Sequence, residues 1–160
     1  MSTHQAVIEW ERGTQVFVDR RYRRAHRWVF DGGQTLAASS SPAVVAPPLS
    51  DPAAVDPEEA YVAALSSCHM LWFLDLACSR GYRVDVYRDA ALGHMTRDEA
   101  GRLWIGRVQL RPHVVFSGTV QPDEPAALEL HHAAHARCFL ANSVRSTIEI
   151  HASWAWVRSD

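Results

Sequence analysis

Two of the three cysteines in this 160-residue chain stand in sequence tracts that favour thiol chemistry. Cys68 lies in the tract DPEEAYVAALSSCHMLWFL, and Cys138 lies in HHAAHARCFLANS, about seventy residues further on. Each tract predicts a helix that carries one cysteine among small and apolar residues. The thiolate is both the nucleophile and the metal ligand, and its formation depends on nearby charge and on solvation. The two tracts therefore indicate either an attacking and a resolving thiol or part of a metal site.

The second tract also holds a row of possible metal ligands. His131, His135 and Cys138 are spaced i, i+4 and i+7, so they share one face of a helix. Imidazole and thiolate groups suit zinc, but no further cysteine or aspartate nearby completes a set of four ligands. The same row of side chains also fits a helix face at a subunit interface.

Cys68 and Cys78 both admit a structural interpretation. An isolated cysteine on an apolar helix is often a small buried core residue, and this alternative stays open for Cys68. Cys78 has no reactive neighbour in the sequence, and we interpret it as structural.

Glu58 begins the helix that carries Cys68 and is a candidate to act on its thiol. On one unbroken helix the ten residues between them span about 15 Å and place the two side chains on different faces. A carboxylate that acts on Cys68 must then come from a second subunit, unless the helix is broken near Ser66-Ser67. Glu58 also fits a structural role, because a carboxylate at a helix start stabilises the helix dipole.

Composition and charge exclude several classes of protein. The net charge of −2 gives no electrostatic footprint for nucleic acid or an anionic membrane, and all sixteen basic residues are arginine, which excludes a lysine Schiff base. Three cysteines without a CxxC do not fit a disulfide scaffold. The N-terminus shows no signal peptide, and Asp75 interrupts the longest apolar run before it could span a bilayer. We expect a soluble cytoplasmic protein.

The elements that position these residues follow an irregular order of strands and helices. Apolar alternation indicates strands, and Asp31-Gly32-Gly33 predicts a hairpin turn. The proline-rich segment 39–56 predicts a long irregular connection. The order predicts an α+β fold in one domain over residues 1–160, with two helices on antiparallel sheet. The expected strands are 7–10, 15–18, 23–30, 34–39, 83–95, 103–116 and 147–157, and the expected helices are 57–80 and 124–140.

The helix expected at 57–80 has the clearest signals. Asp56 is a natural N-cap, Pro57 suits the first helical position, and Gly81 ends the helix. The helix is apolar nearly all round, which predicts a buried central helix. One small sheet could hardly cover it alone, so strands from two chains are expected to cover it in a homodimer.

Two motifs in this chain resemble those of the OsmC/Ohr family. DPEE at 56–59, the small-residue run at 60–67 and Cys68 resemble the NPEE…AAL..C segment of that family. The family's second motif, AHxxCPxSN, resembles four positions here: His135, Cys138, Asn142 and Ser143. The resemblance covers most of the chain from Trp28 onward. Both motifs together, within this α+β order, are fairly specific.

The resemblance implies an OsmC-like intertwined homodimer and a thiol peroxidase that reduces organic hydroperoxides in the defence against oxidative stress. Cys68 corresponds to the peroxidatic cysteine, Cys138 to the resolving cysteine, and Glu58 to the family's active-site glutamate. The apolar surroundings of Cys68 favour an apolar organic hydroperoxide over hydrogen peroxide as the substrate. No cofactor is implied, but an external dithiol must reduce the disulfide that forms.

The family's activating arginine does not carry over to this chain. In some members it follows the GG of the first hairpin, where this chain has Gln34, and in others it precedes the NPEE segment. An arginine there favours the thiolate and binds the peroxide oxygens. Arg24 and His26, which share a face of the strand before the hairpin, are the expected substitutes. Phe139 replaces the proline of the second motif, so the chain fits a divergent subgroup.

A second function, from a different class, stays open. The chain could be a non-catalytic or metal-holding relative that keeps the fold. His131, His135 and Cys138 would then be ligands or interface groups, and Cys68 would be a core thiol.

Overall fold

The computed structural model describes residues 1–157, and the chain divides into two compact units, residues 1–60 and the residues from 61 onward. The first unit contains a three-stranded antiparallel sheet in the order β1-β2-β3. Its strands are β1 (Ala6–Glu9), β2 (His26–Phe30) and β3 (Thr35–Ala38). The predicted hairpin turn joins β2 to β3, with Gly33 at a φ of 83°, where a residue without a Cβ is favoured.

The strand predicted at 15–18 is wrong. The segment after β1 forms turns instead, with the N–H of Gln15 bonded to the carbonyl of Arg12. Its apolar residue Phe17 stacks on Tyr22 at 4.7 Å between ring centroids and packs against Trp10 at 5.8 Å. These residues therefore pack through their aromatic rings within the first unit and do not form a strand.

Helix α1 (Pro57–Ser79) begins and ends as its sequence predicts. Asp56 accepts a hydrogen bond from the Glu59 N–H at 2.8 Å, and Glu59 accepts one from the Asp56 N–H at 3.2 Å, which is a reciprocal capping box. At the other end Gly81 adopts a φ of 78°, and the N–H of Tyr82 bonds to the carbonyl of Ala77. This Schellman arrangement pairs carbonyls that the helix itself leaves free.

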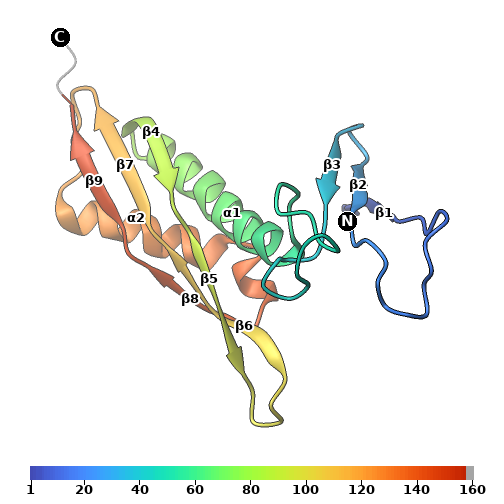
Figure 1. Ribbon diagram of the computed structural model, residues 1–160. Coiled ribbons are helices and arrows are strands. Elements are labelled where there is room, and N and C mark those ends of the chain that lie inside the picture. Colours follow the sequence, from blue (N-terminus) through green and yellow to red (C-terminus); the bar gives the residue numbers. More distant parts are fainter. Residues whose placement is uncertain (158–160) are drawn as a thin grey trace. The chain divides into compact units, whose positions relative to one another are not determined.

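The second unit contains two mixed three-stranded sheets, in the orders β4-β7-β9 and β5-β6-β8. Three chain segments each run through both sheets with a short break, as Figure 1 shows. Within each sheet one strand pair is antiparallel, whereas β8 and β9 pair in parallel with β6 and β7. The strands are β4 (Arg83–Asp89), β5 (Leu92–Arg97), β6 (Leu103–Leu110), β7 (Pro112–Ser117), β8 (Thr147–Ile150) and β9 (Ser153–Trp156).

These sheets correct two sequence predictions. The single strand expected at 147–157 is two strands, broken at His151 and Ala152, and its parallel pairing makes the sheets mixed rather than purely antiparallel. The long hairpin expected from 83–95 and 103–116 is likewise divided near Arg111. Asp89 explains this break, because its carboxylate accepts a hydrogen bond from the Arg111 N–H at 2.7 Å in place of a ladder bond.

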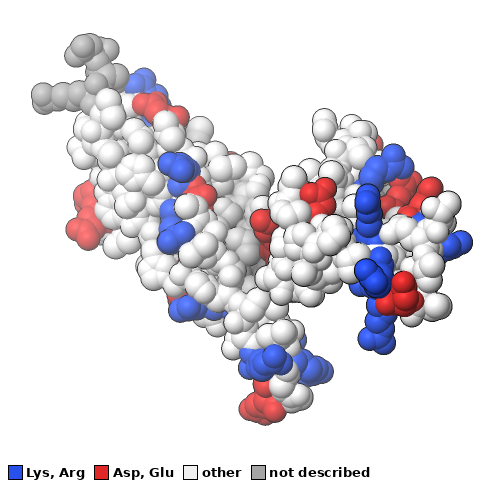
Figure 2. All heavy atoms as spheres, viewed as in Figure 1, with Lys and Arg blue, Asp and Glu red and all other residues white. Residues whose placement is uncertain are grey.

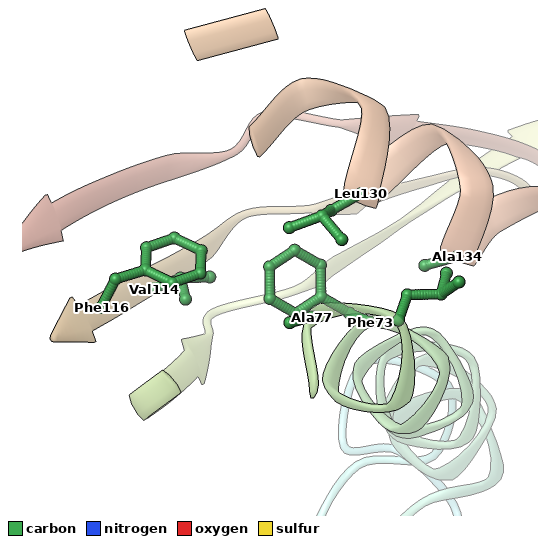
Figure 3. Packing of buried hydrophobic residues seen from close by; sticks show 7 residues of the cluster. Phe73, Ala77, Val114, Phe116, Leu130 and Ala134 are labelled. Carbon is green, nitrogen blue, oxygen red and sulfur yellow. The ribbon is translucent and has the colours of Figure 1, made fainter. Parts of the chain in front are cut away.

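Helix α2 (Glu124–Arg137) and α1 pack together over these strands. In Figure 3, Phe73 and Ala77 of α1 lie close to Leu130 and Ala134 of α2, with Phe116 of β7 nearby. Phe73, Leu130 and Ala134 have no exposed surface. A second cluster, formed around Leu65 and two β6 residues, Val108 and Leu110, seats the first half of α1 on the other sheet. One face of α1 is thereby fixed along most of its length.

The opposite face of α1 is not covered within one chain, and its burial by a second chain stays a prediction. Leu71 is 61% exposed, and the fully buried positions are confined to one face. By length and composition alone α1 could also cross a membrane, contrary to the expectation from sequence. Core helices of soluble proteins share that composition, and α1 buries Leu65 and Phe73 in two separate clusters.

Candidate functional site

The structure brings the two predicted redox cysteines together in the second unit. Cys68 lies in the middle of α1 and is half-buried, whereas Cys138 is 1% exposed at the end of α2. The Cys68 side chain lies close enough to Cys138 to help raise its pKa, and both cysteines are free. Residues far apart in sequence are therefore neighbours where the two helices pack.

Cys138 is not inside a helix, as its sequence tract predicted, but is the C-cap of α2. Its backbone leaves the helix with φ −66° and ψ 111°. The segment that follows folds back on the cap, because Asn142 donates from its side chain to the carbonyl of Ala136 at 3.0 Å and Ser143 donates to the carbonyl of Phe139 at 2.7 Å. Asn142 thus pairs one of the last carbonyls of α2, and Ser143 closes the turn that follows Cys138.

The Cys138 sulfur is held in its protonated form. Burial, followed by the hydrogen bond with Cys68, raises the pKa of Cys138 to about 11, although the Ala141 N–H bonds to its sulfur at 3.4 Å and acts in the opposite direction. Cys138 therefore keeps its proton at neutral pH and can donate it toward the Cys68 sulfur. The half-buried Cys68 is the sulfur that an incoming molecule can reach.

A buried pair of histidines lies beside the two thiols. His69, which follows Cys68, meets His131 of α2 with 3.1 Å between Nε2 and Nδ1, and the two ring planes are parallel to within 1°. Burial lowers the pKa of His69 to about 4, with His135 as a second cause. Burial also lowers the pKa of His131 to about 3, followed by the charges of His69 and His132. Both rings are therefore neutral at pH 7.

The predicted zinc ligands are not assembled. Within residues 1–157, no three His, Cys, Asp or Glu side chains gather as a metal ion requires. His131 turns toward His69 and stacks on Phe73 at 4.3 Å, while Cys138 leaves the helical face because α2 ends at Arg137. The spacing i, i+4, i+7 therefore does not place the three side chains around one point.

The other predicted site residues meet in a cavity of the first unit. The cavity holds about 520 Å³, and Arg24, His26 and Glu58 all line it. The remainder of its wall is mostly apolar, supplied by Ile8, Trp10, Phe17, Tyr22 and Pro57, with Ser39 and Ser40. A hollow with an apolar wall and a few charged groups is the usual form of a small-molecule site.

Arg24 and His26 differ in what they offer to this cavity. The guanidinium of Arg24 stacks over the Tyr22 ring at 3.9 Å, and its Nη1 donates to the carbonyls of Arg20 and Tyr22. His26 uses both ring nitrogens: Nε2 accepts from Trp28 Nε1 at 2.9 Å, and Nδ1 donates to the Arg24 carbonyl at 2.7 Å. An indole N–H only donates, so Nε2 is occupied as an acceptor and His26 has no free nitrogen for proton transfer.

Glu58 lies in the first turn of α1, and the helix is unbroken from there past Cys68. The two side chains are therefore about 15 Å apart along the axis, as expected for ten residues. Of the two routes that the sequence allowed, a broken helix is excluded. Glu58 cannot act on the Cys68 of its own chain.

Sequence reasoning missed the aromatic wall of the cavity and the histidine pair. Trp10, Phe17 and Tyr22 follow no helical or strand period, so no pattern marked them. His69 and His131 stand on separate helices, and each alone is indistinguishable from a surface or core histidine. Only the packing of α1 on α2 pairs them.

Comparison with known proteins defines the class to which this fold and its paired thiols belong. The family model described as OsmC-like protein matches residues 50–153, which include both cysteine motifs. The chain belongs to the OsmC-like protein family, and its α+β fold of two helices with mixed sheets is the fold of that family. No curated protein matches this chain.

Solved structures of this fold include proteins with and without a described activity. An OsmC-like protein of unknown function from Vibrio cholerae is 48% identical, with a TM-score of 0.94 over 96% of this chain and 100% of its own. An organic hydroperoxide resistance protein from Elizabethkingia anophelis is 16% identical, with a TM-score of 0.67 and 98% of each chain covered. The organic hydroperoxide resistance protein OhrB of Bacillus subtilis is also 16% identical, with a TM-score of 0.60 over 96% of this chain and 98% of its own.

The buried histidines predict how stability depends on pH. Their pKa values lie below 6.5 in the folded protein, so the unfolded chain binds more protons below that pH, and the free energy of unfolding falls from about pH 7 toward pH 3. Each histidine contributes a slope of at most about 1.4 kcal/mol per pH unit. His131→Phe keeps a ring on Phe73 but removes one titrating group, so urea unfolding across this range should show a shallower slope.

The exposed neighbour supplies the control for this measurement. His132→Gln changes an exposed histidine one residue along the same helix. It should leave a slope close to that of wild type, because burial, the largest cause of the lowered His131 pKa, is unchanged. Carboxylates titrate equally in all three proteins, so they cancel in the comparison. An unchanged slope in His131→Phe would show that the pair does not titrate as described.

Proposed function

We propose that the protein is a thiol peroxidase that reduces organic hydroperoxides with Cys68 and Cys138. The observation that carries this proposal is the contact between the two free thiols, one half-buried and one fully buried. Membership of the OsmC-like family, together with fold neighbours named organic hydroperoxide resistance proteins, supports the reaction class.

In the first step the Cys68 thiolate attacks the distal oxygen of the hydroperoxide. A sulfur–oxygen bond forms and the oxygen–oxygen bond breaks, so Cys68 is oxidised to a sulfenic acid and the peroxide is reduced to an alcohol, which takes up a proton. Cys138 is the poorer attacker of the two, because burial keeps it protonated and out of reach of solvent.

In the second step the Cys138 sulfur displaces hydroxide from the Cys68 sulfenic acid. The products are a disulfide and, with the proton of Cys138, a molecule of water. The existing contact between the side chains means that this step needs no large rearrangement. An external dithiol then takes the disulfide back to two thiols by exchange, at the cost of its own oxidation. We propose that no cofactor takes part. The need for a dithiol reductant fits a cytoplasmic protein, because the cytoplasm keeps thiols reduced.

We propose that Arg24 and Glu58 act on the Cys68 of a second subunit. The unbroken helix α1 excludes Glu58 from its own Cys68, and Arg24 lines the same cavity as Glu58. Arg24 would bind the peroxide oxygens and favour the thiolate, which is the role of the arginine that other family members carry elsewhere. The apolar wall of the cavity would hold the organic part of the substrate.

Uncovered apolar surface supports the homodimer that this requires. Every residue of β1 is exposed, including Ile8 at 58%, and Phe30 and Leu36 of the same sheet are each 37% exposed. Leu71 adds an apolar position on the free face of α1. Exposed apolar side chains in each of the two units fit an interaction surface, which a second copy of the chain would cover.

Single cysteine variants test the two-cysteine mechanism. Cys68→Ser should abolish the consumption of cumene hydroperoxide, because the attacking sulfur is gone. Cys138→Ser should complete one turnover and stop at the sulfenic acid, which a dimedone-type probe traps and mass spectrometry detects. The exposed Cys78 is the matched control, and Cys78→Ser should keep the wild-type rate and the Cys68–Cys138 disulfide in peptide maps.

Two results of that experiment would contradict the proposal. A fully active Cys68→Ser protein would exclude the peroxidase mechanism on this thiol. Wild-type turnover of Cys138→Ser with a dithiol reductant would leave a one-cysteine mechanism as the better account.

A second test should distinguish the effect of Arg24 on the reaction rate from that of His26. Arg24→Gln removes a cation from the cavity, and its second-order rate with cumene hydroperoxide should fall on the order of 10²-fold, the usual effect of losing one charge-stabilising donor. His26→Gln should change the rate by only a few-fold, because both ring nitrogens are already bonded within the chain. Stopped-flow oxidation of reduced protein measures both, and equal losses would remove the special role of Arg24.

Mixing two inactive variants tests the second subunit. A mixed dimer of Cys68→Ser and Glu58→Gln chains holds one site in which both residues are intact, if Glu58 acts across the interface. Random exchange makes about half of the dimers mixed, so activity should recover to about a quarter of wild type. If light scattering shows a dimeric mixture and no activity recovers, Glu58 does not act across the interface. A monomer at micromolar concentration would exclude the dimer itself.

A further inference from the structure

A second hollow, in the unit that starts at residue 61, has no part in the thiol chemistry. It holds about 330 Å³ between the start of α1, strand β6 and the loop after Cys138. The size is at the lower end of the range for small-molecule sites. Its lining residues are Tyr61, Trp104, Ile105, Ser143, Val144, Arg145 and Ser146.

Trp104, which lines this hollow and a neighbouring one at the β5–β6 hairpin, carries an unpaired donor. Its indole Nε1 is buried and has no hydrogen-bond partner within residues 1–157. A buried N–H without an acceptor costs about 1–3 kcal/mol, so an acceptor that reached Trp104 Nε1 would be stabilised by that amount. Trp104 lies at a half-buried position of β6.

Arg145 lies over the same indole and has no fixed partner. Its guanidinium carbon is 5.3 Å from the centroid of the Trp104 ring, and within residues 1–157 it makes no hydrogen bond or ion pair. Its charge also acts on Asp98, whose carboxylate is bonded to Arg102 at 2.8 Å. Figure 2 shows basic and acidic side chains together at the tip of the β5–β6 hairpin that carries Arg102. Arg145 is therefore an exposed cation able to swing away from the indole.

The hydroxyl groups of the hollow supply acceptors rather than donors. Ser146 donates to the carbonyl of Ile105, so Tyr61 must donate to Ser146 across their 2.8 Å contact. Ser143 donates to the carbonyl of Phe139. Trp104 and Arg145 are thus the donors left for a ligand, and both suit an oxygen anion. Ile105 and Val144 provide an apolar wall beside them.

We propose that this hollow binds the carboxylate of a small organic acid. Arg145 pairs with the anion through its planar guanidinium, which matches a carboxylate in two parallel hydrogen bonds. Its movement exposes Trp104 Nε1, which donates to a carboxylate oxygen and so loses its unpaired state. The apolar part of the acid lies against Ile105 and Val144.

The indole N–H resonance of Trp104 reports this binding directly. Titration of the reduced protein with sodium benzoate should shift that signal downfield in a ¹⁵N-correlated spectrum and saturate with a Kd on the order of 1 mM, which is reasonable for so small a ligand. Trp104→Phe removes the signal and so assigns it. Arg145→Gln should abolish the saturable shift, whereas Arg102→Gln, which changes an arginine of the neighbouring hairpin, should retain it.

Several outcomes would overturn the proposal. If the Trp104 signal does not move at benzoate concentrations up to about 20 times the expected Kd of about 1 mM, the site is excluded. A second copy of the chain that fills the hollow would give this result. An equal shift with inorganic phosphate or chloride excludes a carboxylate site. A retained shift in Arg145→Gln excludes the arginine. The Cys68→Ser protein should give the same shift as wild type, because this site is independent of the thiols.

Discussion

The packing of one face of α1 against α2 is the constraint on which the remaining structure depends. Phe73 and Ala77 interlock with Leu130 and Ala134 at full burial, and this fixes which side chains of the two helices face each other. Protein interiors are packed as densely as organic crystals, so the helices cannot slide without opening voids. One turn before Phe73, this fixed alignment brings Cys68 onto Cys138 and His69 onto His131. The thiol contact is thus a consequence of core packing.

The same packing makes the two thiols chemically unequal. Cys138 sits in the buried layer between the helices, where the charged form of any group is disfavoured, while Cys68 lies nearer the uncovered face of α1. The histidine pair shows the same effect with opposite sign, because burial there removes a positive charge rather than a negative one. Two neutral rings beside the thiols add no cation to the site. Stabilisation of a thiolate must therefore come from a group outside this helix pair.

Sequence alone predicted the parts of the fold that depend on local signals. The start and end of α1 follow from Asp56, Pro57 and Gly81, whose effects act within a few residues. The parallel pairing of β8 with β6 and of β9 with β7 was not predictable, since it is fixed by contacts between residues about forty positions apart. The end of α2 was placed three residues too late, because Phe139 and Leu140 continue an apolar pattern that the chain uses outside the helix. Contact between Cys68 and Cys138 was expected from family resemblance, and helix spacing alone could not have predicted it.

We propose that Arg24 supplies the positive charge that the helix pair lacks. Its position is fixed in part by the neighbouring ring of His26. The indole of Trp28 fixes the tautomer of His26, and His26 in turn holds the Arg24 carbonyl. The Tyr22 ring supports the guanidinium from one side. Each of these contacts is made before any substrate binds, so little side-chain entropy remains to be lost when an anion arrives. These contacts support the proposal that Arg24 takes the place of the family's usual arginine. In that proposal His26 is a support for Arg24, because both of its ring nitrogens are already bonded within the chain.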